Sequence, residues 1–112
     1  MSSATKKIQI NFDLEEGAMK EMVVGDGDKD KVLISKYAGK LYATGAFCSH
    51  YDVPLQGGVR AANKIICPAH SASFDLITGR SLSGPGRDGI PTFKIVTEGE
   101  KSFVIVPEEG ID

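Results

Sequence analysis

Short runs rich in β-branched and aromatic residues recur along this chain, and a turn-forming or charged residue bounds each one. The chain has 112 residues, with 13 glycines and 5 prolines spread through it rather than clustered. Such runs are typical of antiparallel sandwiches and barrels. Helical periodicity is hard to find. We therefore expect an all-β fold with strands in seven segments: Ile8–Phe12, Met19–Val24, Val32–Lys36, Lys40–Thr44, Lys64–Ile66, Thr92–Val96 and Ser102–Val106.

Two pairs of these segments predict β-hairpins. Gly39 lies between the third and fourth segments and offers the positive φ that a tight turn needs. Gly99 takes the same place between the last two segments. From about residue 45 to 87 the β pattern thins, and Gly, Pro and Ser collect there. This stretch predicts loops inserted between strands, and loops on a rigid β scaffold often carry binding sites.

All the cysteines and histidines of the chain fall in that stretch, in two short blocks. The first block is Cys48-Ser49-His50 and the second is Cys67-Pro68-Ala69-His70. The least specific interpretation is two buried structural cysteines and two unrelated surface histidines. A second is a structural zinc site, because two thiolates and two imidazoles satisfy tetrahedral Zn²⁺. Zinc fingers usually place a Cys pair first and a His pair second, however. The third is a two-iron cluster with one thiolate and one imidazole from each block.

The two blocks resemble the Rieske family, in which a pair of histidines replaces a pair of cysteines on one iron. The family pattern is Cys-x-His, roughly 15 to 17 residues, then Cys-x-x-His, and it is matched in full. The resemblance extends to the hairpins, to Thr78-Gly79-Arg80, and to a loop around Pro85 that would cover the cluster.

The resemblance implies one Rieske domain over residues 1–112. The expected Rieske fold is an antiparallel β-sandwich or barrel base domain with a small cluster-binding subdomain of two ligand loops, at about residues 45–87. One [2Fe–2S] cluster per chain is implied. Cys48 and Cys67 would bind the inner iron, and His50 and His70 the outer iron near the surface.

Four positions near the ligands indicate a low reduction potential. High-potential members of the family carry two further cysteines that form a disulfide, and this chain has Val53 and Ala69 there. Those members also carry a Ser and a Tyr that donate to sulfur, at the positions of Ala72 and Phe74. Hydrogen bonds to sulfur stabilise the reduced cluster, so their absence predicts about −150 mV, at the lower end of the Rieske range. Ser71 and Ser73 lie close by and are alternative donors.

As a low-potential type, this chain resembles the Rieske ferredoxins of the family. This implies a one-electron carrier, not an enzyme on its own, that takes electrons from a flavoprotein reductase using FAD and NAD(P)H. The acceptor would be an oxygenase or another redox protein. One alternative is the N-terminal Rieske domain of an apoptosis-inducing-factor-like flavoprotein. A Rieske non-haem oxygenase would need two further histidines for its second iron, and a zinc-stabilised binding module would be colourless.

Charge and hydropathy exclude two classes of partner. The formal net charge is −2 and no basic face stands out, which argues against nucleic acid. No apolar run approaches the roughly 18 residues of a membrane span. The expected compartment is the cytoplasm, with the mitochondrion as the alternative.

Overall fold

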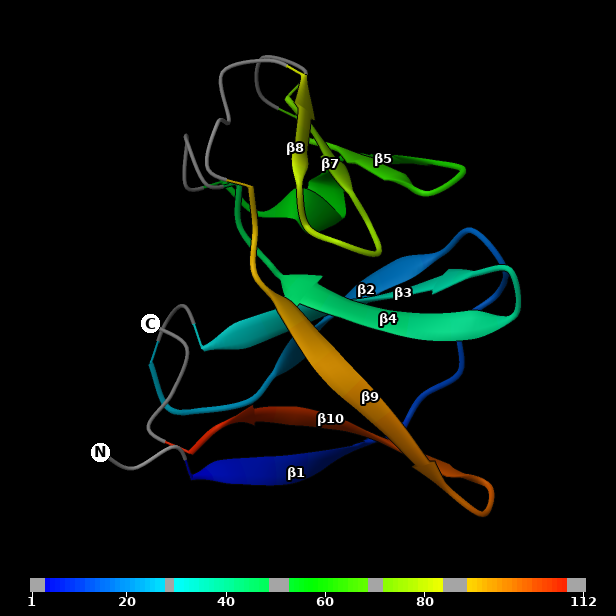
Figure 1. Cartoon of the computed structure of the whole chain (residues 1–112), viewed down its shortest axis with the longest axis vertical. Helices are drawn as coiled ribbons and strands as arrows, with labels where there is room; N and C mark the ends of the chain where they lie inside the picture. Colours follow the sequence, from blue (N-terminus) through cyan, green and yellow to red (C-terminus); the bar gives the residue numbers. More distant parts are fainter. Residues whose placement is uncertain (1–3, 28–29, 49–52, 69–71, 84–88, 109–112) are drawn as a thin grey trace.

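The computed structural model describes residues 4–27, 30–48, 53–68, 72–83 and 89–108. Within these ranges, ten strands and one short 3-10 helix, η1, follow one another (Figure 1). Their bounds are β1 Thr5–Ile10, β2 Met19–Val23, β3 Lys31–Tyr37, β4 Lys40–Gly45, η1 Leu55–Gly57, β5 Val59–Ala61, β6 Lys64–Ile66, β7 Ser73–Asp75, β8 Ser81–Ser83, β9 Thr92–Glu98 and β10 Lys101–Pro107. The predicted all-β fold is confirmed. No helix in these ranges is long and apolar enough to cross a membrane.

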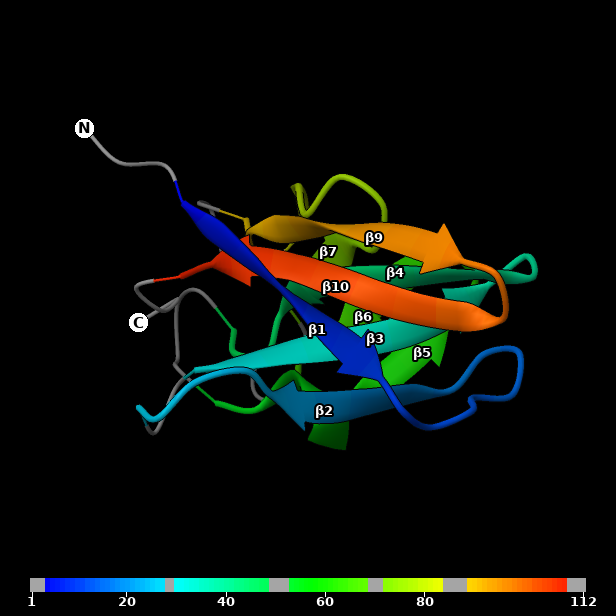
Figure 2. The same cartoon turned by 90° about the horizontal axis from the view of Figure 1, so that it is seen from below.

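The strands form two antiparallel sheets. The larger sheet has the order β1-β10-β9-β4-β3-β2, and the smaller has the order β5-β6-β7-β8. The larger sheet curls, so that β1 and β10 lie across from β2 and β3 (Figure 2). We call it the base. The smaller sheet and η1 come from the chain between β4 and β9, and we call them the upper layer.

Both predicted hairpins are present. Tyr37 pairs with Lys40, and Ala38 and Gly39 between them both have positive φ, at 53° and 78°. Two consecutive positive φ values are what a type I′ turn requires. The N–H groups of Ala38 and Gly39 donate to the Glu16 carboxylate at 2.6 and 3.0 Å, and these bonds lower the pKa of Glu16.

Between residues 45 and 87 we expected loops and one strand at Lys64–Ile66, which is β6. This stretch also contains β5, β7 and β8, each three residues long, which were not predicted. These three strands lack the two adjacent isoleucines that mark β6, so the sequence pattern does not reveal them. The upper layer is therefore a small sheet of its own.

Strand β3 is buried on both faces and joins two hydrophobic cores. Val32, Leu33 and Ile34 are all 0% exposed. Val32 and Ile34 belong to the core inside the curl of the base, with Val104 and Val106 of β10. Leu33 belongs to a second core, between the base and the upper layer. A strand covered on both sides has a continuous apolar run, as this one does.

Candidate metal centre

The two cysteines occupy equivalent places at the starts of two loops. Cys48 donates its backbone N–H to the carbonyl of Val53 at 2.9 Å. Cys67 donates in the same way to Ala72, also five residues later, at 2.7 Å. Each cysteine is thus the last paired residue before its loop. The sequence folds this way because short ladders precede both loops, an isolated bridge of Phe47 with Pro54 for the first and β6 with β7 for the second.

Two glycines bring the ends of the loops together. A Cβ on Gly58 would lie 2.0 Å from the carbonyl oxygen of Ile66, the residue before Cys67. Only glycine allows the backbone after η1 to approach β6 so closely. Gly57 lies beside Pro68, whose Cγ would be 4.0 Å from an added Cβ. The segment that follows the first loop therefore packs against the start of the second loop.

Both cysteine side chains are buried in the same core. Cys48 and Cys67 are each 2% exposed, and neither forms a disulfide. Their surroundings are apolar and include the fully buried Leu55, Ala72 and Phe74. Burial excludes water from both sulfur atoms. Two buried cysteines outside any disulfide, on adjoining loops, suit a pair of thiolate ligands to one metal, and thiolates are the donors that iron–sulfur clusters use.

The other two predicted ligands, His50 and His70, lie outside the described residues, as does the predicted loop around Pro85. Within the described ranges, no three His, Cys, Asp or Glu side chains gather as a metal site. Two of the residues discussed for the potential are seen directly. Ala72 and Phe74 are both fully buried, and neither carries a hydroxyl group.

Sequence reasoning did not identify Arg60, which fastens the upper layer to the base. Its Nη1 atom, from β5, donates to the carbonyls of Lys36 at 3.0 Å and Ala18 at 3.3 Å. Its Nη2 atom donates to Ala62 in the turn that follows β5. Removal from water lowers the pKa of the guanidinium, while the Glu16 carboxylate acts in the opposite direction. Arg60 lies in a segment that was not predicted to be a strand, and nothing in the sequence indicates that it joins the two layers.

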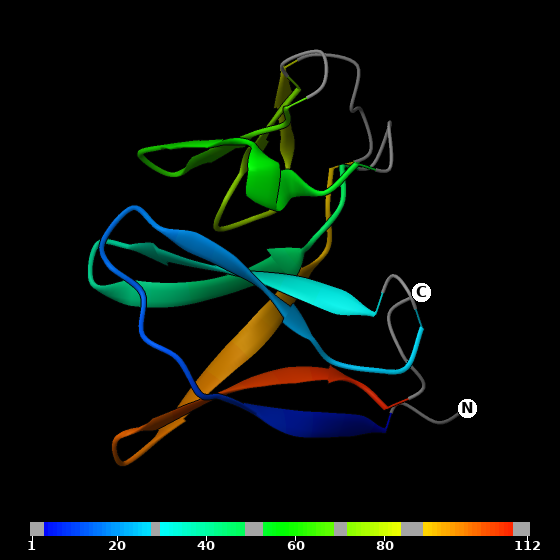
Figure 3. The same cartoon turned by 180° about the vertical axis from the view of Figure 1, so that it is seen from behind.

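A second contact joins the same two parts of the molecule. Gln56 of η1 accepts a hydrogen bond from the backbone N–H of Glu21 in β2. Figure 3 shows η1 lying between the small sheet and β2. The first loop therefore ends in a segment fixed to the base, and Arg60 fixes the strand that follows.

Replacing Arg60 with methionine is expected to lower the free energy of unfolding by about 1–2 kcal/mol, because charged hydrogen bonds to carbonyls are lost from a half-buried site. Chemical denaturation of the metal-loaded protein measures this loss. The matched control is Lys64→Met, an exposed residue on the neighbouring strand β6, with an expected change within about 0.5 kcal/mol. Equal stability of the two variants would contradict the role assigned to Arg60.

The fold and the paired thiols define an all-β metalloprotein of the iron–sulfur class. The chain belongs to the Rieske [2Fe-2S] domain family, whose model matches residues 6–94, a range that includes both Cys/His blocks. The family binds a [2Fe–2S] cluster, so this chain is a [2Fe–2S] protein domain.

Three comparisons place the chain among its relatives. It is 37% identical to apoptosis-inducing factor 3 of Homo sapiens over 99 residues, which are 88% of this chain but 16% of that protein. It is 27% identical to the ferredoxin component of the naphthalene 1,2-dioxygenase system of Pseudomonas aeruginosa, over 83% of this chain and 86% of that one. The solved structure of the ferredoxin of carbazole 1,9a-dioxygenase from Nocardioides aromaticivorans IC177 superposes with a TM-score of 0.75 at 25% identity, covering 90% and 99% of the two chains.

Proposed function

We propose that this chain is a one-electron carrier, with a Rieske cluster held by Cys48, His50, Cys67 and His70. The observation that carries the proposal is the pair of buried cysteines, neither in a disulfide, at equivalent positions of two adjoining loops. The cysteines would hold the inner iron and the histidines the outer one. When bound, the cluster supplies a centre that accepts and releases a single electron. One domain spanning residues 1–112, with its cluster-binding part at about 45–87, is part of the same proposal.

The chain's own residues then have separable roles. The two thiolates contribute two negative charges where four thiolates would contribute four, so an added electron is tolerated more easily. The apolar core around Leu55 and Phe74 keeps water from the sulfur atoms. The backbone N–H groups of both cysteines are engaged in closing the loops, which fixes each ligand's position.

The proposed donor is a flavoprotein reductase using FAD and NAD(P)H, and the proposed acceptor is an oxygenase or another redox protein. Support for these partners comes from the similarity to ferredoxin components of dioxygenase systems, matched over most of their own length. The chain spans only a small part of apoptosis-inducing factor 3. Work as an in-cis domain of such a flavoprotein is the less favoured alternative.

Absorption and electron paramagnetic resonance spectra of the purified protein, oxidised and then dithionite-reduced, test the proposal. We expect a red-brown protein whose reduced form gives a rhombic signal with an average g below that of all-thiolate clusters. Subsequent bleaching by a dioxygenase-system flavoprotein reductase with NADH would support the donor. A colourless protein that holds zinc and no iron after anaerobic reconstitution would overturn the proposal.

We also propose a potential at the lower end of the Rieske range, about −150 mV. Replacing Ala72 with serine is expected to raise it by roughly 60 mV, because a hydroxyl donor to a charged acceptor is worth about 1.5 kcal/mol and a one-electron couple shifts 59 mV per 1.4 kcal/mol. Protein-film voltammetry measures the change.

The matched control for this variant is Ala43→Ser, which adds a hydroxyl to an equally buried alanine in the other core. We expect that control to leave the potential within error of the parent protein. An unchanged potential in Ala72→Ser, with the cluster intact, would mean that another group already supplies this hydrogen bond, Ser71 and Ser73 being the nearest hydroxyls in sequence.

A further inference from the structure

Strands β4 and β9 pair over a short distance and then separate. Their ladder consists of Ala43 with Phe93 and Thr44 with Thr92, and the Gly45 N–H extends it by donating to the Pro91 carbonyl at 2.8 Å. Among the described residues, no ladder pair continues beyond Ala43 and Phe93. Figure 1 shows β9 leaving β4 at a steep angle. We call the space between the separating strands the wedge.

The register determines which backbone groups face the wedge. In an antiparallel ladder, alternate residues turn their N–H and C=O groups toward the same neighbour. Because Gly45 and Pro91 face each other, Leu41 of β4 and Ile95 of β9 also turn toward the opposite strand. The β9–β10 pairing agrees, since Glu98 and Lys101 close that hairpin and Thr97 is left facing the wedge. None of these three wedge-facing residues forms a ladder pair across the wedge within the described ranges.

The side chains give the wedge two different faces. Leu41 and Ile95 lie on the face toward the core of the base, where both pack partly against it. Alternation along the strands places Lys40 and Lys94 on the other face, and both are exposed. Two cavities of about 390 and 320 Å³ lie at the wedge and share Leu41 and Ile95 in their linings. Their walls also include Tyr42, Ile77 and Thr97.

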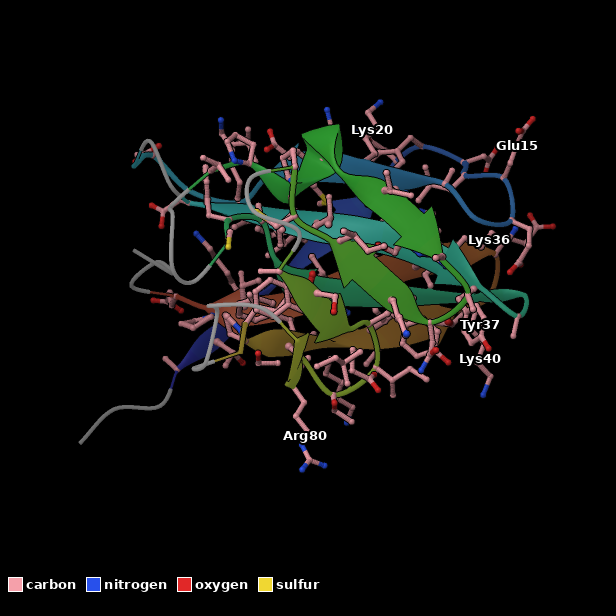
Figure 4. All side chains as sticks on the ribbon, turned by 90° about the horizontal axis from the view of Figure 1, so that it is seen from above. Glu15, Lys20, Lys36, Tyr37, Lys40 and Arg80 are labelled. Carbon is pink, nitrogen blue, oxygen red and sulfur yellow. The ribbon has the colours of Figure 1, made fainter. Side chains whose placement is uncertain are left out.

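Lysine side chains lie on the outer face of the wedge. Figure 4 shows Lys40 at the tip of the β3–β4 hairpin and Arg80 well apart from it, at the lower edge of the view. Within the described part of the chain, no carboxylate forms an ion pair with Lys40, Lys94 or Arg80. Beside these cations, Ile77 is 46% exposed, which is high for a large apolar side chain. The wedge is therefore apolar inside and carries cationic side chains at its rim.

We propose that the wedge binds an extended, acidic segment of a partner protein by β-strand addition. The wedge-facing N–H and C=O groups of Leu41, Ile95 and Thr97, which lie beyond the β4–β9 ladder, would pair with the main chain of that segment. The side chains of an extended segment alternate between faces, so its apolar residues would meet Leu41 and Ile95. Its acidic residues would meet Lys40 and Lys94. The matching sequence is therefore an alternation of apolar and acidic residues.

This inference concerns a surface apart from the two cysteine loops, so it can fail while the electron-carrier proposal holds. The test uses the ¹⁵N-labelled, cluster-loaded protein and a short capped peptide in which valine and glutamate alternate. We expect saturable shifts of the Leu41, Ile95 and Thr97 amide resonances and slower hydrogen exchange at these amides. A peptide in which lysine replaces glutamate is expected to bind at least about tenfold more weakly.

A charge-reversed variant tests the acidic preference without touching the core. Lys40→Glu combined with Lys94→Glu is expected to weaken binding of the glutamate peptide at least about tenfold and to favour the lysine peptide. Lys20→Glu combined with Lys64→Glu, the same double charge reversal at exposed residues outside the wedge, is the matched control and should bind like the parent. The proposal is overturned if neither peptide shifts the three amide resonances. The two lysines would then serve only to prevent association at an exposed strand edge. The proposal is equally overturned if those amides shift with protein concentration alone, which would identify a second copy as the occupant.

Discussion

The Cys67→Ser protein is expected to bind essentially no iron, whereas the parent protein binds two irons per chain. A thiolate is the ligand that iron–sulfur clusters use, and the serine hydroxyl remains protonated at neutral pH and supplies no equivalent charge. The position is 2% exposed, so water cannot substitute for the lost ligand without entering an apolar core. Iron and acid-labile sulfide analysis, together with the visible spectrum, measures this result. We expect the same outcome for Cys48→Ser, because both cysteines hold equivalent positions.

The control for this experiment separates loss of a ligand from loss of stability. Leu55 is fully buried in the core that contains both cysteines. Leu55→Ala is expected to cost about 2–5 kcal/mol of folding free energy, yet to keep full iron content in its folded fraction. If Cys67→Ser retained the iron and the spectrum of the parent, the ligand assignment would be wrong. If Leu55→Ala lost its iron while folded, the experiment would report on packing rather than ligation.

The Gly79→Ala protein is expected to lose about 3 kcal/mol or more of its folding free energy. Gly79 has a φ of 76°, and an added Cβ would lie 2.0 Å from the carbonyl oxygen of Ile90. The carbonyl of Gly79 also accepts a hydrogen bond from the N–H of Ile90 at 2.7 Å, at the point where the chain leaves the upper layer for β9. The backbone would have to move at the junction that carries the second sheet. Chemical denaturation followed by circular dichroism measures the loss.

Gly39 offers a closely matched control for this substitution. Its φ is 78°, and an added Cβ would meet nothing within 4 Å. Gly39→Ala therefore carries the cost of a left-handed alanine alone, about 1 kcal/mol. The difference between the two variants isolates the steric clash at Ile90. Equal losses in both variants would show that the close approach at Gly79 is relieved at no cost.

The parts of the fold that local signals specify were predicted from the sequence. Gly39 and Gly99 lie at the two hairpin turns because each needs a positive φ, which glycine adopts freely. The seven predicted segments all became strands, including the three-residue β6 with its two adjacent isoleucines. In contrast, β5, β7 and β8 depend on pairing with neighbours in the upper layer. Their three residues carry no such apolar β-branched pair.

The candidate site divides in a similar way. The Cys/His spacing identified the family, and the structure adds that Cys48 and Cys67 are buried, equivalently placed and outside any disulfide. The roles of His50 and His70 stay predictions, since both lie outside the described residues. Arg60 and Gly58 could not have been found from the sequence. Their importance comes from carbonyl oxygens that are distant along the chain and are brought near only by folding.

The double burial of β3 makes the two layers thermodynamically inseparable. Val32 and Ile34 close one core, and Leu33, on the opposite face of the same strand, closes the other. Opening the base would strip Leu33 of its neighbours and expose the apolar surroundings of both cysteines. The two layers should therefore behave as a single unit in native-state hydrogen exchange, with the amides of β3 opening only in global unfolding. A partner that holds the base closed would then also protect the metal from release, at a distance and without touching either cysteine loop.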